Sequence, residues 1–131
     1  MPLDCRISTG STTPIYRQLI DQIRLVVLRG RLTPGDRLPS VRSLAQRLVI
    51  NPNTVARAYG ELTRDGVIVS QRGKGYFVAR KRQVYTKTHQ RRRLAPLVDA
   101  LVSEAALLEV PADDVVVAVQ ERLRKYGLDS S

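Results

Sequence analysis

Apolar residues recur at helical spacing in two short neighbouring segments of the N-terminal half. Residues 41–48 carry apolar side chains at positions i, i+3, i+4 and i+7, and residues 55–62 repeat this spacing. Each segment therefore has one apolar face to bury and one polar face to expose. Ser40 and Asn51 are residue types that cap helix N-termini, and Pro52 suits the first helical position. The pattern predicts two helices joined by a tight turn.

A third helical pattern precedes this pair, beginning at Ile15 and ending near Gly30. Residues 1–12 end in a run of small polar side chains, which predicts a flexible N-terminal arm with Cys5 as a free thiol. Pro and Gly at the central places of residues 33–36 predict a type II turn, followed by a very short strand at Leu38.

Two short runs with strand character, residues 67–70 and 76–79, flank the glycine-rich and doubly basic segment 71–75. This predicts a β-hairpin whose glycines let its tip approach a sugar-phosphate backbone. A solvated basic turn would have the same composition. Beside a helix pair with a polar second helix, however, the hairpin predicts the wing of a winged helix-turn-helix domain over residues 13–79.

The remaining part, residues 80–131, predicts a linker and a helical hairpin, so the chain is mainly α with a small β-hairpin. Pro96 either begins the first of these helices or kinks a longer one. Two helices alone bury little apolar surface, so they either fold back on the N-terminal domain or pack against a second chain. We expect a homodimer through a stripe made of Leu94, Leu97, Val98, Leu101, Ala105, Leu108, Val116, Val119 and Leu123.

The charge of the chain points to a polyanionic partner. Its formal net charge is +10; residues 1–80 hold 13 Lys and Arg against 5 Asp and Glu, and residues 81–131 hold 9 against 7. Nucleic acid is favoured over a membrane, because no basic amphipathic segment stands alone and no apolar run is long enough to cross a bilayer. We therefore expect a cytoplasmic protein.

The same composition argues against catalysis. One cysteine and one histidine, His89, supply no nucleophile pair and no metal cluster. Asp113 and Asp114 suit a helix start, and residues 73–75 lack the spacing of a nucleotide-binding loop. We expect no enzyme activity, no metal and no cofactor.

Several linked motifs resemble the GntR family of bacterial transcription regulators. They are PIYRQL at residues 14–19, PGDRLPSVR at 34–42, NPNTV at 51–55, Gly66, and RGKGYFV at 72–78. The short C-terminal part is similar to that of the YtrA subfamily, which lacks a large effector-binding domain. The resemblance implies a winged-helix DNA-binding domain, a dimer and a near-palindromic operator, and members of this family usually repress transcription.

The resemblance also implies which residues meet double-stranded DNA. It places the start of the first motif helix at phosphates, the helix 51–65 in the major groove and the wing 71–75 at the minor groove. The implied DNA-binding residues are Ser40, Arg42, Asn51, Asn53, Thr54, Arg57, Arg72, Gly73, Lys74 and Gly75. We expect Arg57 to read a base, because its fork fits guanine, and Arg42 and Lys74 to set position and salt dependence.

One departure and three alternatives accompany this interpretation. The family commonly has Gly where this chain has Val49, and a β-branched residue is costly at positive φ. The same elements could serve as a protein-interaction module, or as an architectural or RNA-binding winged helix with weak sequence preference. A small-molecule effector of unknown identity, bound between the wing domain and the helical hairpin, is a further hypothesis.

Overall fold

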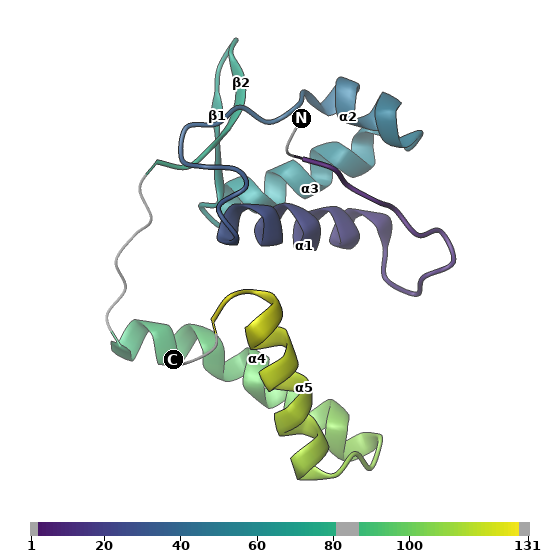
Figure 1. Ribbon diagram of the computed structural model, residues 1–131, viewed down its shortest axis with the longest axis vertical. Helices are drawn as coiled ribbons and strands as arrows, with labels where there is room; N and C mark the ends of the chain where they lie inside the picture. Colours follow the sequence, from purple (N-terminus) through teal and green to yellow (C-terminus); the bar gives the residue numbers. More distant parts are fainter. Residues whose placement is uncertain (1–2, 81–86, 129–131) are drawn as a thin grey trace. The chain divides into compact units, whose positions relative to one another are not determined.

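The computed structural model describes residues 3–80 and 87–128 of the chain, which divides into two compact units, residues 1–82 and 83–131. The first unit contains the elements α1 (Ile15–Leu28), α2 (Val41–Leu48), α3 (Pro52–Arg64), β1 (Ile68–Gln71) and β2 (Gly75–Val78). The second contains α4 (Lys87–Leu107) and α5 (Ala112–Lys125), as Figure 1 shows. The predicted fold class, mainly α with one small β-hairpin, is confirmed.

In the first unit α1 and α2 both pack against α3, whose residue Tyr59 has no exposed surface. Its hydroxyl donates a 2.7 Å hydrogen bond to the carbonyl of Pro39, and its ring meets that of Tyr76 edge-on at 4.9 Å. Burial raises the pKa of the Tyr59 phenol well above its ordinary value. Tyr59 therefore joins three parts of the unit: α3, the segment before α2, and the hairpin.

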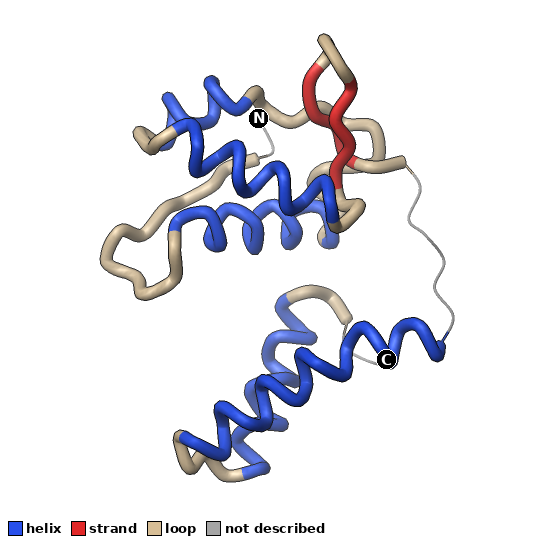
Figure 2. The backbone as a smooth tube through the Cα atoms, turned by 180° about the vertical axis from the view of Figure 1, so that it is seen from behind, coloured by secondary structure: helices blue, strands red, loops and turns tan. Residues whose placement is uncertain are grey.

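The hairpin is the two-stranded element drawn in red in Figure 2. It is antiparallel, and its register pairs Ile68 with Val78 and Gln71 with Gly75. A third segment lies along the free edge of β2. There the N–H of Leu38 donates to the carbonyl of Tyr76 at 2.9 Å, and Arg37 forms a β-bridge with Phe77. The short strand predicted at Leu38 thus attaches the base of the hairpin to the segment that leads into α2.

The turns follow the sequence predictions closely. Gly35 has φ +90° in the turn 33–36, where the N–H of Asp36 donates to the carbonyl of Thr33, as a type II turn requires. Val49 ends α2 in the left-handed region with φ 56° and ψ 51°. A β-branched residue therefore occupies a conformation that glycine adopts without strain.

The N-terminal segment differs from the predicted flexible arm. Leu3 and Cys5 are buried in the core, and Ile7 packs against it. The side-chain amide of Gln22 exchanges hydrogen bonds of 2.8 and 2.7 Å with the backbone of Arg6. Residues 3–8 therefore form a packed segment and not the expected mobile arm, because alternate apolar side chains give this extended stretch one face to bury. Cys5 is a free thiol, as expected, but a buried one.

In the second unit, α4 begins at Lys87 and continues through Pro96, so the proline lies inside a longer helix. The α4–α5 connection passes through Glu109, which adopts a φ of 58°. No described residue of α4 or α5 is buried. Ala105, Val115 and Tyr126 are half-buried, and the other described side chains of this unit are exposed. The hairpin thus forms as predicted, and most of its apolar residues are exposed.

Candidate nucleic-acid interface

The helix α3 has a buried face and an opposite face made of polar, basic and very small residues. Val55, Ala58, Tyr59 and Leu62 are buried. At 100° per residue the opposite side carries Asn53, Ala56, Arg57, Gly60 and Arg64, and all of them are exposed. Open space surrounds the position that a Cβ would take at Gly60. The middle of this face therefore leaves the helix backbone accessible between two cationic side chains.

Ser40 and Asn51 cap the two motif helices. The Ser40 hydroxyl accepts a 3.0 Å hydrogen bond from the N–H of Ser43, and the Asn51 side chain accepts one of 2.9 Å from the N–H of Asn53. Both side chains are exposed and retain a donor, the hydroxyl hydrogen of Ser40 and the amide hydrogens of Asn51. Each helix start therefore combines the positive end of a helix dipole with a donor suited to an anion.

Arg57 is held against a residue of another helix. Its guanidinium carbon lies 3.7 Å from the ring centroid of Tyr16, near the start of α1. This cation–π contact restricts the side chain that the sequence predicts to read a base, while the side chain stays exposed. The sequence pattern gives Tyr16 no role at the interface, because nothing in it shows which aromatic ring α3 meets.

The acidic groups of α3 are neutralised by α1. Glu61 lies 3.6 Å from the guanidinium of Arg17. Asp65, the C-cap residue, pairs with Arg24. Because these pairs are partly exposed, each contributes little to stability. Their effect on the interface is electrostatic. Arg17 compensates the negative charge of Glu61, which lies at the edge of the face proposed to meet DNA phosphates.

The tip of the hairpin is exposed and cationic. Arg72, Gly73 and Lys74 form the turn, closed by a 2.9 Å hydrogen bond from the N–H of Lys74 to the carbonyl of Gln71. Gly73 has φ +75° and Gly75 has φ +112°, which L side chains rarely adopt. A Cβ at Gly75 would make only ordinary van der Waals contact with Arg37, 3.5 Å from its Nε, so the backbone conformation and not crowding favours glycine here.

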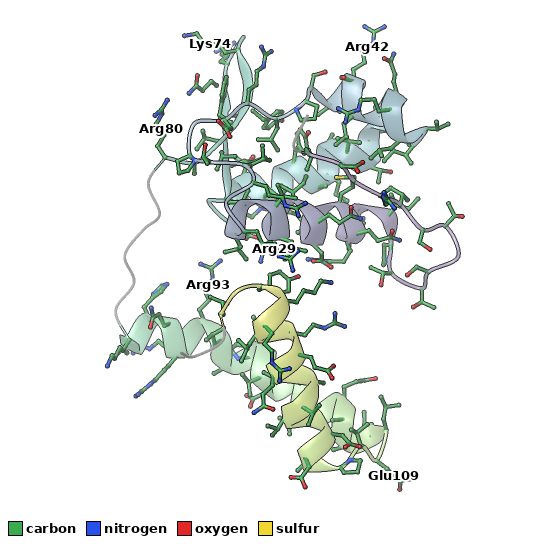
Figure 3. All side chains as sticks on the ribbon, viewed as in Figure 1. Arg29, Arg42, Lys74, Arg80, Arg93 and Glu109 are labelled. Atoms are coloured by element: carbon green, nitrogen blue, oxygen red, sulfur yellow. The ribbon has the colours of Figure 1, made fainter. Side chains whose placement is uncertain are left out.

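Arg37 is a cation of the wing that sequence analysis missed. It is exposed and precedes the buried Leu38 in the segment paired with β2. The alternation of exposed and buried residues in that short strand is the signal that could have found it. In Figure 3, Arg42 and Lys74 extend from the same side of the first unit, and Arg29 extends from the opposite side.

The sequence-predicted DNA-binding residues all lie in the first unit, at the start of α2, on the first half of α3 and at the tip of the hairpin. Thr54 and Gly75 are half-buried, and the other eight are exposed. The predicted dimerisation residues lie in the second unit. Leu94, Leu97, Val98, Leu101, Leu108, Val116, Val119 and Leu123 are 38–66% exposed, and Ala105 is half-buried.

The described part of the chain gives little support for a metal site, a reactive thiol or a membrane-spanning helix. Residues 3–80 and 87–128 contain no group of three His, Cys, Asp or Glu side chains placed to hold a metal ion. Burial raises the pKa of the Cys5 thiol to about 11, which disfavours a reactive thiolate. None of the described helices is both long enough and apolar enough to span a membrane.

Comparison with known proteins agrees with this geometry. The pattern of the family described as "Bacterial regulatory proteins, gntR family" matches residues 15–78. The chain is 49% identical over 74 residues to the HTH-type transcriptional repressor YtrA of Bacillus subtilis (strain 168), covering 56% of this chain and 57% of that protein. The match therefore spans less than two thirds of this relative's length.

Three solved structures are similar. YtrA from Sulfolobus acidocaldarius, a GntR-family transcription factor, has a TM-score of 0.61 at 37% identity, covering 76% of this chain and 97% of that one. A transcriptional antiterminator from Listeria monocytogenes EGD-e has a TM-score of 0.79 at 28% identity, covering 96% and 93%. AraR(DBD) in complex with operator ORX1 has a TM-score of 0.53 at 26% identity, covering 59% and 96%.

Proposed function

The chain belongs to the GntR family of bacterial regulatory proteins, and from this premise we propose that it is a sequence-specific DNA-binding transcriptional regulator. In this proposal it acts as a homodimeric repressor and blocks transcription by occupying a near-palindromic operator. The observation that carries the proposal is the exposed face of α3, with Asn53, Arg57 and Arg64 around the small residues Ala56 and Gly60.

In the proposed complex, α3 enters the major groove with this face toward the base edges. A B-DNA major groove admits one α-helix, and small residues on the helix let its backbone come close to the bases. Arg57 pairs with a guanine, since its fork matches the two acceptors O6 and N7. Asn53 and Thr54 supply shorter hydrogen-bonding groups beside it.

Phosphate contacts position the helix in this proposal. Ser40 and Arg42 at the start of α2 hold the backbone on one side, and Arg72 and Lys74 at the tip of the hairpin hold it on the other. Such contacts fix register and orientation and make affinity depend on salt, but they carry no sequence information of their own. The common direction of Arg42 and Lys74 supports this arrangement (Figure 3).

We propose that the helical hairpin of the second unit forms the dimer interface. Leu97 is 64% exposed and Leu108 is 66% exposed, on a hairpin in which no described residue is buried. A monomer with so large an apolar surface in water would aggregate, whereas a second copy of the hairpin can cover it. A two-fold dimer would also present two copies of α3 to two half-sites of one operator.

Selection of binding sites from random duplexes tests the proposal. The full chain is incubated with a randomised duplex pool, and the bound fraction is sequenced after several rounds. The proposal predicts a near-palindromic consensus whose half-sites lie roughly one helical turn apart, about 10 base pairs. Enrichment of no sequence would contradict it and favour an architectural winged helix. RNA offered in a parallel pool tests the RNA-binding alternative.

A further inference from the structure

The first two turns of α4, Lys87–Arg93, form a helical segment with no apolar face. Its sequence is KTHQRRR, every residue in it is exposed, and the apolar stripe of the helix begins only at Leu94. We refer to Lys87–Arg93 as the basic segment; Figure 3 labels its last residue. A helix that is polar on all sides gains no stability from packing. The interface proposed for the hairpin therefore gives no reason for the helix to extend this far.

The charges of the basic segment oppose the helix dipole. Lys87 lies at the positive end of α4, whose first turn contains no acidic residue, and the first acid of this helix is Asp99. Lys87 and Arg91 are also four positions apart, a spacing at which like charges destabilise a helix. The charge of Lys87 at the helix start and its repulsion with Arg91 both disfavour the helix, and an anion beside these two residues would offset both effects.

The neighbouring helix shows the favourable arrangement. α5 carries Asp113 and Asp114 in its first turn and Arg122, Arg124 and Lys125 in its last turn. Both placements stabilise the helix through its dipole. The charges of α5 therefore stabilise that helix, whereas the charges at the start of α4 do not stabilise α4. The difference points to an external polyanion for the basic segment of α4.

The length of the chain limits how far the basic segment can lie from the wing. A fully extended path from Val78 to Lys87 covers at most about 32 Å. When the wing is bound to a duplex, the segment is therefore held at a high effective concentration of phosphates. Seven helical residues are about 10 Å long, and duplex DNA presents a negative charge about every 1.7 Å along its axis.

We propose that the basic segment of α4 binds the phosphate backbone of duplex DNA beside the half-site occupied by the winged helix. The contact rests on the proposed DNA-binding function and adds a second cationic surface to it, carried by the other unit of the chain. Because phosphates are the ligand, this contact extends the length of duplex that the protein covers and carries no sequence information.

The experiment compares full-length variants on two duplexes over a salt series. One duplex contains the selected consensus alone, and the other adds 10 base pairs of random sequence on each side. Arg91→Gln with Arg92→Gln removes two cations from the basic segment, and Gln preserves helix propensity. Arg122→Gln with Arg124→Gln removes two cations from α5 and is the matched control for net charge. Arg91→Lys with Arg92→Lys keeps the charge.

The proposal predicts a loss confined to the longer duplex. Neutralising Arg91 and Arg92 should weaken binding to it on the order of tenfold at 0.1 M salt and make the log–log salt slope shallower by about 1.8, for two lost phosphate contacts. The lysine pair should bind like the unmodified chain, since phosphates require charge and not the guanidinium fork. The α5 control should also bind normally.

Three results would overturn the inference. They are equal binding of the glutamine pair and the unmodified chain to the longer duplex, an equal loss in the α5 control, and a loss that is the same on both duplexes. Each leaves the proposed function intact, since the unmodified chain would still bind the consensus. Failure of the unmodified chain to prefer either duplex over scrambled DNA would instead contradict the proposed function. Mass and helicity measured for every variant separate a binding defect from a folding defect.

Discussion

The guanidinium of Arg57 lies 3.7 Å from the centre of the Tyr16 ring, so α1 orients a side chain of α3. A cation–π contact at an exposed site is worth about 0.5–1 kcal/mol, enough to favour one rotamer over its alternatives. We therefore interpret Tyr16 as a positioning residue that acts on DNA through Arg57. A substitution of Tyr16 alone would not distinguish an effect through Arg57 from an effect on DNA or on the fold by another route.

A double-mutant cycle tests this coupling. Arg57→Ala should reduce affinity for the selected duplex by about 1–3 kcal/mol, the value of one bidentate base contact, and leave affinity for scrambled duplex nearly unchanged. Tyr16→Leu should cause a smaller loss of the same kind. In the Arg57→Ala background, Tyr16→Leu should cause no further loss, because its target is gone. Fluorescence anisotropy at constant salt measures the affinities of the unmodified chain, the two single variants and the double variant.

Two variants control this experiment. Tyr16→Phe keeps the ring and should bind the selected duplex like the unmodified chain. Arg31→Ala removes an exposed cation from the turn that follows α1 and should leave the preference for the selected duplex unchanged. Additive losses from Tyr16→Leu and Arg57→Ala would show that Tyr16 acts on DNA or on the fold by another route.

Val49 provides a test of backbone strain. It is 89% exposed and has a φ of 56°, so its side chain buries little while its backbone occupies the left-handed region. That region costs an L-residue about 1–2 kcal/mol, and glycine loses about 0.5–1 kcal/mol through its flexible unfolded state. Val49→Gly should therefore stabilise the first unit by roughly 0.5–1 kcal/mol, measured by urea unfolding.

Val69→Gly is the matched control, because Val69 is also partly exposed but lies in the regular backbone of β1. There glycine removes β propensity and adds unfolded-state entropy, so the variant should be less stable than the unmodified chain. If Val49→Gly also destabilised the protein, the strain of the left-handed conformation at Val49 would be smaller than the entropic cost of glycine.

At the scale of elements, the N-terminal segment makes stability depend on pH. Burial raises the pKa of the Cys5 thiol from 9.0 to about 11. Between these values the unfolded chain loses its thiol proton while the folded chain keeps it. The stabilisation is thus complete below about pH 9 and is lost as pH rises toward 11. From pH 9 to 10 the free energy of unfolding should fall by about 1 kcal/mol.

Cys5→Ala provides the comparison for this pH dependence. Its stability should fall much less from pH 9 to 10, because the pKa of the buried Tyr59 phenol is raised from an ordinary value of 10.0 and most of its contribution is lost above that pH. Urea unfolding at several pH values measures both chains. An equal fall in the two would show that another group, and not the thiol, controls stability in this range.

Elements with strong local signals could be predicted from the sequence. The caps at Ser40 and Asn51, the turn at Gly35 and the hairpin around Gly73 each depend on residue types with a local conformational preference. The packed segment from Leu3 to Ile7 was missed, because its alternation contains only three apolar residues and lies beside a polar run. The start of α4 at Lys87 was missed because the basic segment has no apolar period.

Some features of the candidate site could likewise be predicted from the sequence, and others could not. The exposed face of α3 follows from helical periodicity, so Asn53 and Arg57 could be placed on one side of a helix. The contact of Arg57 with Tyr16 and the approach of Arg37 to Gly75 join residues distant in the sequence, and no local pattern encodes either. These contacts follow from how α1 crosses α3 and from the pairing of residues 35–38 with β2.

At the scale of the whole molecule, the second unit should determine the oligomeric state. Burying a leucine side chain contributes about 1.5–3 kcal/mol, and a carboxylate in the same interface adds a desolvation cost. Leu97→Glu should therefore raise the dimer dissociation constant by at least about tenfold, as measured by sedimentation equilibrium. The first unit should keep its fold, since Leu97 lies outside it.

Leu28→Glu is the control for this prediction. Leu28 is a 41% exposed leucine at the end of α1 in the first unit, and its substitution adds the same charge outside the helical hairpin. This variant should remain dimeric. Loss of the dimer in both variants, or in neither, would place the interface somewhere other than the hairpin.

Sequence-specific DNA binding is tested most directly by the affinity of the full chain for its selected duplex and for a scrambled duplex of equal length, over a salt series. We expect a preference of about 10³-fold or more for the selected duplex and affinities that fall steeply with salt on both. Equal, salt-sensitive binding to the two duplexes would contradict sequence-specific regulation, and no binding at low salt would contradict DNA binding itself.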